Sequence, residues 1–283
     1  MRRREFLQSG WLAASSLPLT ARAAGPRKAT DVITLGPDQL KLTRLAMGTG
    51  TRGYLQSSNQ TRRLGLRGLA DLLKFGFDSG ITFWDSADAY GSHPHLKEAL
   101  RSVPREKVAI LTKTHARTAA EMRADLDRFR QELGADYLDI VLLHAMMQAN
   151  WPESRQGAME ALSEARQKGI VRTHGISCHS LAALKTTAAT PWARTNLIRI
   201  NPAGVNMDAA PAAVVGVMKE MKAAGKGLIG MKILGEGELR HRVDETLRFA
   251  LALDYLDCFT IGFESRQELA DLVQRVPRAS QAA

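Results

Sequence analysis

The chain has 283 residues, of which 45% are hydrophobic and 24% are charged, a composition typical of a globular protein with one large core. Only two cysteines are present, so a scaffold held together by disulfides is excluded, and both read as buried thiols. The net charge of +10 does not indicate a nucleic-acid partner, because basic residues alternate with acidic ones along the helical segments.

The first residues have the layout of an export signal. Arginines at positions 2–4 precede Phe6 and Leu7, and an uncharged run follows from Ser9 to Thr20. Ala21, Arg22 and Ala23 then form a small-x-small motif at which a signal peptidase could cut. This segment resembles a twin-arginine signal peptide.

The resemblance implies that residues 1–24 are a signal peptide and that residues 25–283 are the mature domain, with a net charge of +7. It also implies a periplasmic protein whose partner during export is the twin-arginine machinery. We expect no stable membrane span after cleavage, because the apolar run is short for a bilayer. The alternative is a basic membrane-surface anchor that is not cleaved.

A β-hairpin is predicted next, from Ile33–Leu35 and Leu40–Leu42 with a turn at Gly36, Pro37 and Asp38. Short apolar runs then alternate with longer amphipathic segments. The eight predicted strands are Leu45–Gly48, Ile81–Asp85, Val108–Lys113, Tyr137–His144, Val171–Ser177, Leu197–Asn201, Leu228–Leu234 and Cys258–Gly262. Nearly continuous apolar strands of this kind are typical of a parallel sheet covered on both faces.

The segments between the strands predict helices. One runs from Ala119 to Leu133 and ends at Gly134, and the last begins with a capping box at Ser265 and Glu268. Eight strand-helix units predict an α/β fold, a (β/α)8 TIM barrel with an N-terminal hairpin that could plug one end.

An open doubly wound sheet is the alternative fold. Gly48, Gly50 and Gly53 match the spacing of the dinucleotide-binding GxGxxG turn. However, no amphipathic helix begins directly after Gly53, and no acidic residue ends a second strand about 20 residues further on.

Polar side chains end three consecutive predicted strands. These are Asp85, Lys113 and His144, with Tyr90 five residues beyond Asp85. In a barrel they would meet at the carboxyl ends of the strands. A tyrosine hydroxyl has an ordinary pKa near 10 and needs a neighbouring cation to act as an acid near neutral pH. Lys113 could supply that charge, Asp85 could orient Lys113, and His144 could donate a hydrogen bond to a substrate oxygen.

These residues resemble the catalytic tetrad of the aldo-keto reductase family. Residues 83–91 (FWDSADAYG), 111–113 (LTK) and 142–144 (LLH) match three family segments in order. The resemblance implies an NAD(P)(H)-dependent oxidoreductase that reduces an aldehyde or ketone to an alcohol, or catalyses the reverse, with Tyr90 as the general acid or base. A small carbonyl or alcohol compound would be its substrate.

The resemblance also assigns residues to the cofactor. They are Gly50, Thr51, Ser177, Asn201, Ile233, Leu234, Gly235 and Gly262. Two departures from the family pattern concern the nicotinamide, because Cys178 follows Ser177 where asparagine is usual, and Asn201 stands in the region of a usual glutamine.

The sequence gives opposing signals on the choice between NADP(H) and NAD(H). Glu268 and Leu272 occupy positions at which many family members carry arginine and asparagine. An acid there would repel a 2′-phosphate, whereas the positive charge of Arg266 would attract it. From the habit of the family we expect NADP(H) to be slightly preferred over NAD(H).

Three further expectations complete the sequence-based interpretation. No metal site is predicted, because the histidines do not pair with acids or cysteines at ligand spacing. An exported enzyme could carry its cofactor out already bound. The alternatives to an enzyme of this family are a nicotinamide-binding sensor or partner-binding barrel without catalysis, and a redox protein that uses the Cys178 thiol.

Overall fold

Eight parallel strands close into a barrel in the structure, a computed structural model that describes residues 25–282. The barrel strands are β3 (Leu45–Gly48), β4 (Phe83–Asp85), β5 (Ala109–Thr114), β6 (Leu138–Met146), β7 (Val171–Cys178), β8 (Thr195–Arg199), β9 (Gly227–Met231) and β10 (Cys258–Gly262). Two further strands, β1 (Val32–Leu35) and β2 (Leu40–Thr43), form a separate antiparallel sheet. The barrel order runs from β3 to β10, with β10 paired to β3. This confirms the predicted barrel and excludes the open sheet.

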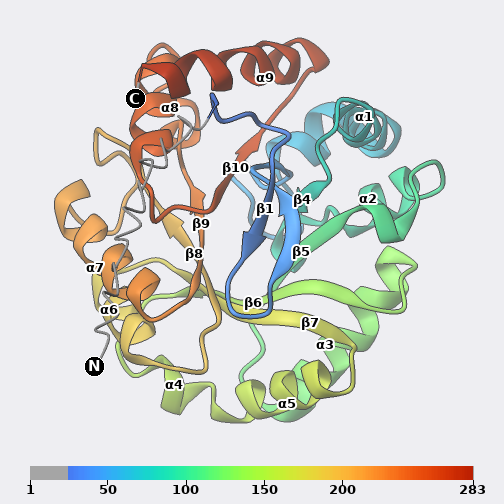
Figure 1. The fold of residues 1–283 in the computed structure, drawn as a ribbon. Helices are drawn as coiled ribbons and strands as arrows, with labels where there is room; N and C mark the ends of the chain where they lie inside the picture. The colour runs from blue at the N-terminus through green and yellow to red at the C-terminus, as the bar shows by residue number, and fades with distance from the viewer. Residues whose placement is uncertain (1–24, 283) are drawn as a thin grey trace, which may run out of the picture.

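Helices surround the barrel (Figure 1). They are α1 (Asn59–Asp78), α2 (His93–Ala99), α3 (Ala119–Leu133), α4 (Trp151–Ser154), α5 (Gln156–Gln167), α6 (Leu181–Ala189), α7 (Pro211–Ala223), α8 (Val243–Ala252) and α9 (Arg266–Gln281), with short 3-10 turns η1 (Asp88–Tyr90), η2 (Arg105–Lys107) and η3 (Gly235–Gly237). No helix in this part of the chain combines the length and the apolar character that crossing a membrane requires.

Two apolar layers follow from the alternation of side chains along each strand. Phe83, Leu111 and Leu142 belong to the cluster inside the barrel. Their strand neighbours Trp84 and Ile110 belong to the larger cluster between the barrel and the helices. The same alternation decides which polar residues at the strand ends can face the barrel axis.

Residues at the two ends of the helix α3 define where it begins and where it ends. It begins after Thr118, whose hydroxyl accepts from the Glu121 amide, while the Glu121 carboxylate accepts from the Thr118 amide. It ends at Gly134, which has a φ of 64°, a left-handed conformation that suits glycine. The predicted bounds Ala119–Leu133 are confirmed.

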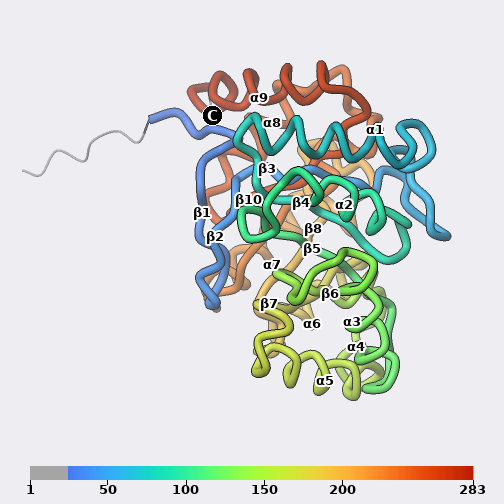
Figure 2. Tube along the Cα trace, turned by 90° about the vertical axis from the view of Figure 1, so that its right-hand side faces the viewer, coloured from blue at the N-terminus to red at the C-terminus, as the bar shows by residue number. Residues whose placement is uncertain are grey.

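The predicted hairpin is confirmed as β1 and β2, and it covers one end of the barrel (Figures 1 and 2). Leu35, Leu40 and Leu42 join the apolar cluster of the barrel interior. The hairpin therefore closes the barrel at the end where the parallel strands begin.

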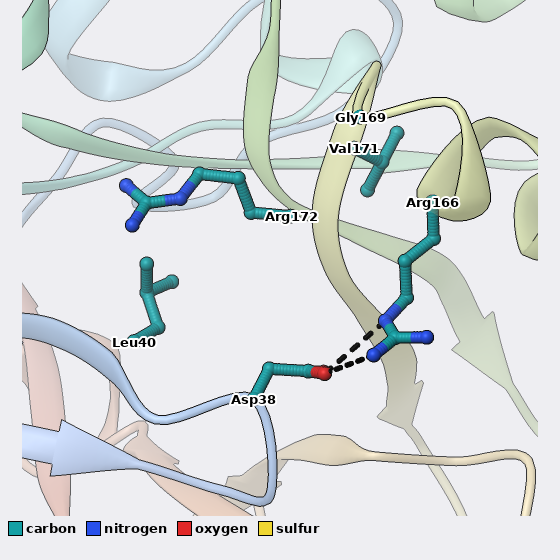
Figure 3. A pocket seen from close by; sticks show the side chains of 6 residues that line it. All are labelled: Asp38, Leu40, Arg166, Gly169, Val171 and Arg172. Carbon is teal, nitrogen blue, oxygen red and sulfur yellow. Dashed lines mark hydrogen bonds and ion pairs between the residues drawn. The ribbon is translucent and has the colours of Figure 1, made fainter.

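Asp38, in the turn of this hairpin, links the hairpin to the wall of the barrel. Its carboxylate accepts hydrogen bonds from the side chains of Arg166, Arg194 and Thr173. Figure 3 shows Asp38 bonded to Arg166, and both side chains line a pocket of about 330 Å³. The carboxyl ends of the strands lie at the opposite end of the barrel, so these contacts serve the fold.

Two strands end earlier than the sequence predicts. The strand β9 stops at Met231 because Lys232 has a φ of 60°, which is incompatible with a strand. The strand β8 stops at Arg199, so Asn201 lies in the following loop. Both differences change the surroundings of residues that were predicted to bind the cofactor.

Candidate active site

The four predicted catalytic residues gather at one end of the barrel. Asp85 ends β4, Lys113 is in β5 and His144 is in β6, each two residues beyond an inward-facing apolar residue of its strand. Tyr90 ends the 3-10 turn η1 that follows β4. Because the strands are parallel and adjacent, their carboxyl ends bring these side chains together.

Lys113 is fully buried and its ammonium group contacts three oxygen atoms. It donates to Asp85 Oδ1 at 2.5 Å, to the Ser86 carbonyl at 2.7 Å and to Tyr90 Oη at 3.4 Å. The Lys113 Nζ atom also lies 4.7 Å from the centre of the Tyr90 ring. A buried ammonium group thus connects the tyrosine hydroxyl to a carboxylate.

The Tyr90 ring lies against two glycines of the loop after β3. A Cβ atom added at Gly50 would come within 2.1 Å of the ring, and one at Gly53 within 2.2 Å. Any side chain at either position would displace the ring. The structure therefore gives Gly50 a role that the sequence did not suggest, because it makes space for Tyr90.

The electrostatics favour a protonated tyrosine beside a charged lysine. Burial raises the pKa of Tyr90, and the Lys113 ammonium offsets part of that increase. Burial alone would lower the pKa of Lys113, but Asp85 and Tyr90 hold it above its ordinary value. At neutral pH the hydroxyl can donate a proton, and the ammonium can stabilise the phenolate that remains.

His144 belongs to a group of three imidazoles. Its ring stacks on that of His115, with 4.8 Å between centroids, and meets His179 edge-on at 6.2 Å. Its centroid is 5.7 Å from that of Tyr90, at an angle of 83°. Burial, together with the charge of Lys113, lowers the pKa of His144 well below its ordinary value. The imidazole is therefore neutral and can donate one hydrogen bond.

A cleft of about 740 Å³ extends from the tetrad toward the start of α9. Its lining residues come from the loops after β3, β9 and β10 and from α9. They include Gly50, Thr51, Asp85, Tyr90, Lys232, Ile233, Leu234, Arg240, Gly262, Glu264 and Glu268. Two residues of the tetrad, Asp85 and Tyr90, line this cleft.

The predicted cofactor residues fall into two groups. Gly50, Thr51, Ile233, Leu234 and Gly262 line the cleft. Gly235, Ser177 and Asn201 are buried and are absent from the lining.

Ser177 is the predicted residue with a free polar group. Its neighbour Cys178 packs among the helices, so by alternation Ser177 faces the barrel interior. Its hydroxyl is buried and has no partner among the described residues. Buried polar groups rarely stay unpaired, so a ligand amide is a fitting partner.

The side chain of Asn201, which the family resemblance assigns to the cofactor, is fully hydrogen-bonded within the protein. Its side-chain amide donates to the carbonyls of Val205 and Lys232, and its oxygen accepts from the amides of Ala203 and Val205. These bonds use both donors and both lone pairs of the side chain. Asn201 therefore shapes the loop after β8, and its contact with the nicotinamide stays a prediction.

The Cys178 thiol lies on the other face of β7. Its sulfur is 3.3 Å from Thr187 Oγ1 of α6, and the side chain packs in the outer apolar layer. Burial raises the pKa of Cys178 to about 12, so the reactive thiolate is not formed near neutral pH. The structure argues against the thiol-dependent alternative.

Several lining residues escaped the sequence analysis. Lys232 follows the strand β9 and forms an ion pair with Glu236, while Arg63 of α1 forms one with Glu264. Arg240 donates to the Gly237 carbonyl at 3.2 Å. The left-handed φ of Lys232 turns it out of the strand, and no local sequence signal predicts this conformation.

One group of potential metal ligands occurs in the described residues. Ligand atoms of Asp88, His93 and Glu132 lie within 4.8 Å of one another. The Arg128 guanidinium, however, forms ion pairs with both carboxylates, and His93 hydrogen-bonds Glu132 at 2.7 Å. These residues form a charged network with its own cation.

Comparison with known proteins agrees with this geometry. Residues 45–274 match the model of the Aldo/keto reductase family. The chain belongs to this family. The matched segment includes all four residues of the tetrad and the whole of the described cleft.

Curated relatives of this aldo-keto reductase match over part of their length. The NAD/NADP-dependent indole-3-acetaldehyde reductase of Schizosaccharomyces pombe is 28% identical over 60% of this chain and 59% of that protein. Aldo-keto reductase family 1 member C21 of Mus musculus is 28% identical over 38% of this chain and 41% of that protein. The chain thus spans about half the length of the curated relatives it matches.

Solved structures share the fold at low sequence identity. A Pseudomonas aeruginosa protein assigned to the aldo-keto reductases has a TM-score of 0.74 at 21% identity, covering 89% of this chain and 98% of that one. The Bombyx mori aldo-keto reductase in complex with NADP has a TM-score of 0.65 at 17% identity, covering 92% and 93%.

Proposed function

We propose that this aldo-keto reductase is an NAD(P)(H)-dependent oxidoreductase that reduces an aldehyde or ketone to an alcohol, or catalyses the reverse reaction. The observation that carries the proposal is the buried chain of contacts from Asp85 through Lys113 to the Tyr90 hydroxyl. Burying these charged groups lowers the stability of the folded protein, because charges lose favourable contacts with water. A barrel that only bound a partner or sensed a ligand would have no use for them.

In the proposed mechanism Tyr90 donates its proton to the substrate carbonyl oxygen. The Lys113 ammonium then stabilises the phenolate, and Asp85 and the Ser86 carbonyl keep that ammonium in place. The neutral His144 imidazole donates a hydrogen bond to the same substrate oxygen and so orients it. In the reverse direction the phenolate accepts the proton of the alcohol.

The residues of the cleft fit a nicotinamide dinucleotide. When bound, this cofactor supplies or accepts the hydride. The unpaired Ser177 hydroxyl would bond the carboxamide, and Gly50 and Thr51 would lie beneath the adjoining ribose. Lys232 lines the same cleft, where its ammonium group pairs with Glu236. The loop 233–235 would wrap the pyrophosphate, with Ile233 and Leu234 on the cleft.

We propose NADP(H) as the preferred form, with Arg240 facing the 2′-phosphate. Among the described side chains Arg240 has no carboxylate partner, whereas Arg63 is neutralised by Glu264. The opposing feature is Glu268, whose carboxylate accepts from the Glu264 amide at 2.7 Å. A titration of the purified chain with NADPH and then NADH tests this preference. Tighter binding of NADH would overturn it.

Substitution of Tyr90 by phenylalanine tests the catalytic proposal. The variant loses one hydroxyl, and general acid catalysis contributes about 10²- to 10⁴-fold to the rate. We expect kcat for carbonyl reduction to fall by that factor while the dissociation constant of the cofactor is unchanged. Full activity in Tyr90→Phe would refute the role of Tyr90. A wild-type chain that binds cofactor but reduces no carbonyl compound would favour the non-catalytic barrel.

We also propose that the protein is exported to the periplasm by the twin-arginine route, with residues 1–24 as its signal peptide. Those residues lie outside the part of the chain that the structure describes, and the proposal is supported by their sequence. Replacing Arg3 and Arg4 by lysine should leave the protein in the cytoplasm, as cell fractionation would reveal. Periplasmic recovery of this variant would contradict the proposal.

A further inference from the structure

Tyr90 differs from the rest of the tetrad in its support. Asp85, Lys113 and His144 belong to strands of the barrel, and Asp85 and Lys113 are paired there with Leu111 and Leu142 of the neighbouring strands. Tyr90 instead belongs to the single 3-10 turn η1, whose residues are all partly exposed. Its hydroxyl lies 3.4 Å from Lys113 Nζ, near the limit of a hydrogen bond. A small movement of the turn would break that contact.

An arginine from a distant helix holds this turn. Arg128 of α3 donates from Nη1 to Asp88 Oδ1 at 2.7 Å and from Nη2 to Asp88 Oδ2 at 3.0 Å. Asp88 is the first residue of η1, two positions before Tyr90. The bidentate geometry fixes both the distance and the plane of the carboxylate. A single-point contact would not fix that plane.

The guanidinium is itself held on its own helix. Arg128 also donates to Asp125 Oδ1 at 2.7 Å and to Glu132 Oε1 at 3.0 Å. Burial alone would raise the pKa of Asp88, but Arg128 and Gln56 hold it below its ordinary value. The carboxylate is therefore charged at neutral pH, and the ion pair between α3 and η1 is intact.

A second contact joins the turn to the loop that carries Gly50 and Thr51. Gln56 Nε2 donates to Asp88 Oδ1 at 3.2 Å. The Gln56 carbonyl also packs so closely on Gly91 that a Cβ there would lie 2.2 Å from it. The Tyr90 ring, the glycines beneath it and the turn thus form one unit that Asp88 anchors to α3.

We propose that Arg128 is a positioning residue for the proton-transfer step, acting through Asp88 to keep the Tyr90 hydroxyl within reach of Lys113 and the substrate. The inference rests on the proposed catalytic function. Arg128 touches neither substrate nor reacting atoms, so it acts on the rate only through the turn. Displacements of about 1 Å at a reacting group can cost on the order of 100-fold in rate.

The test compares Arg128→Met and Asp88→Ala with Arg123→Met. Arg123 lies on the same helix and pairs with Glu164 of α5, away from the site. We expect kcat to fall about 10- to 100-fold in the first two variants, with the dissociation constant of NADPH and the melting temperature nearly unchanged. Arg123→Met should match the wild type. Arg128→Lys should recover only part of the loss, because lysine cannot form the bidentate pair.

The double variant Asp88→Ala/Arg128→Met sharpens the test. If the two residues act through their shared contact, the double variant should be no slower than either single one. Wild-type kcat in Arg128→Met, an equal loss in Arg123→Met, or fully multiplied losses in the double variant would each overturn the inference. Failure of the proposed function looks different, because the wild type would then reduce no carbonyl compound or Tyr90→Phe would stay active.

Discussion

The replacement of Gly50 by alanine tests directly how the Tyr90 ring is placed. The new Cβ would lie 2.1 Å from Cε2 of the ring and 2.4 Å from both Cδ2 and Cζ. Carbon atoms pack favourably at about 3.5–4.0 Å, so the ring must move by more than about 1 Å. Gly50 is not among the residues with a left-handed φ, so the expected effect of alanine arises from the steric clash with the Tyr90 ring and not from backbone strain.

Two quantities should change in Gly50→Ala. Overpacking a well-packed site costs about 1–3 kcal/mol, which in a domain of this size lowers the melting temperature by about 2–10 °C. Displacing the hydroxyl from Lys113 should lower kcat/KM by about 100-fold. The loss of activity should persist at temperatures at which the variant is fully folded.

The assay combines steady-state kinetics with thermal melts, and Gly216→Ala is the matched control. Gly216 lies in α7, and a Cβ there would meet nothing within 4 Å. This control should keep full activity and gain about 1 kcal/mol of stability, because alanine favours helices over glycine. If Gly50→Ala kept kcat/KM within twofold of the wild type, the glycine would not be what places Tyr90.

Two other predictions concern residues outside the cleft. Replacing Asp38 by asparagine should cost about 1.5–3 kcal/mol at pH 7, because hydrogen bonds to charged groups are lost. Although burial alone would raise the pKa of Asp38, its bonds to Arg194, Thr173 and Arg166 hold it below the ordinary value. This contribution to stability is present above the unfolded pKa of about 3.9 and is lost as pH falls through the lower folded value. In urea melts the free energies of unfolding of the two proteins should therefore become equal in acid. A difference that stays constant with pH would argue against the ion pairs. Replacing Cys178 by alanine should leave kcat unchanged and lower stability slightly, whereas a loss of turnover would revive a role for the thiol.

The sequence predicted best those features that depend on neighbouring residues. The helix α3 was placed correctly because Thr118 and Glu121 form a capping box and Gly134 ends the helix. The strand β3 and its apolar pattern were also predicted with the right bounds, Leu45–Gly48. Local hydrogen bonds and side-chain periodicity are sufficient for such features.

Features that depend on distant residues were missed. The hydrogen bonds of the Asn201 amide to the backbone of its own loop and to the Lys232 carbonyl were not predicted. The pair of Arg128 and Asp88 joins residues 40 positions apart, and neither residue carries a local signal. Such contacts become visible only when the barrel has brought α3 beside η1.

The pairing of β3 with β10 has a consequence for when the protein can fold. These strands stand at opposite ends of the sequence, and the barrel closes only through the contacts of Leu45–Gly48 with residues 259–262. Arg27 likewise bonds the Leu251 carbonyl and Asp254. The barrel therefore cannot close until residues 259–262 have been synthesised and have left the ribosome. A transport system that accepts only folded cargo would have to wait for that last strand.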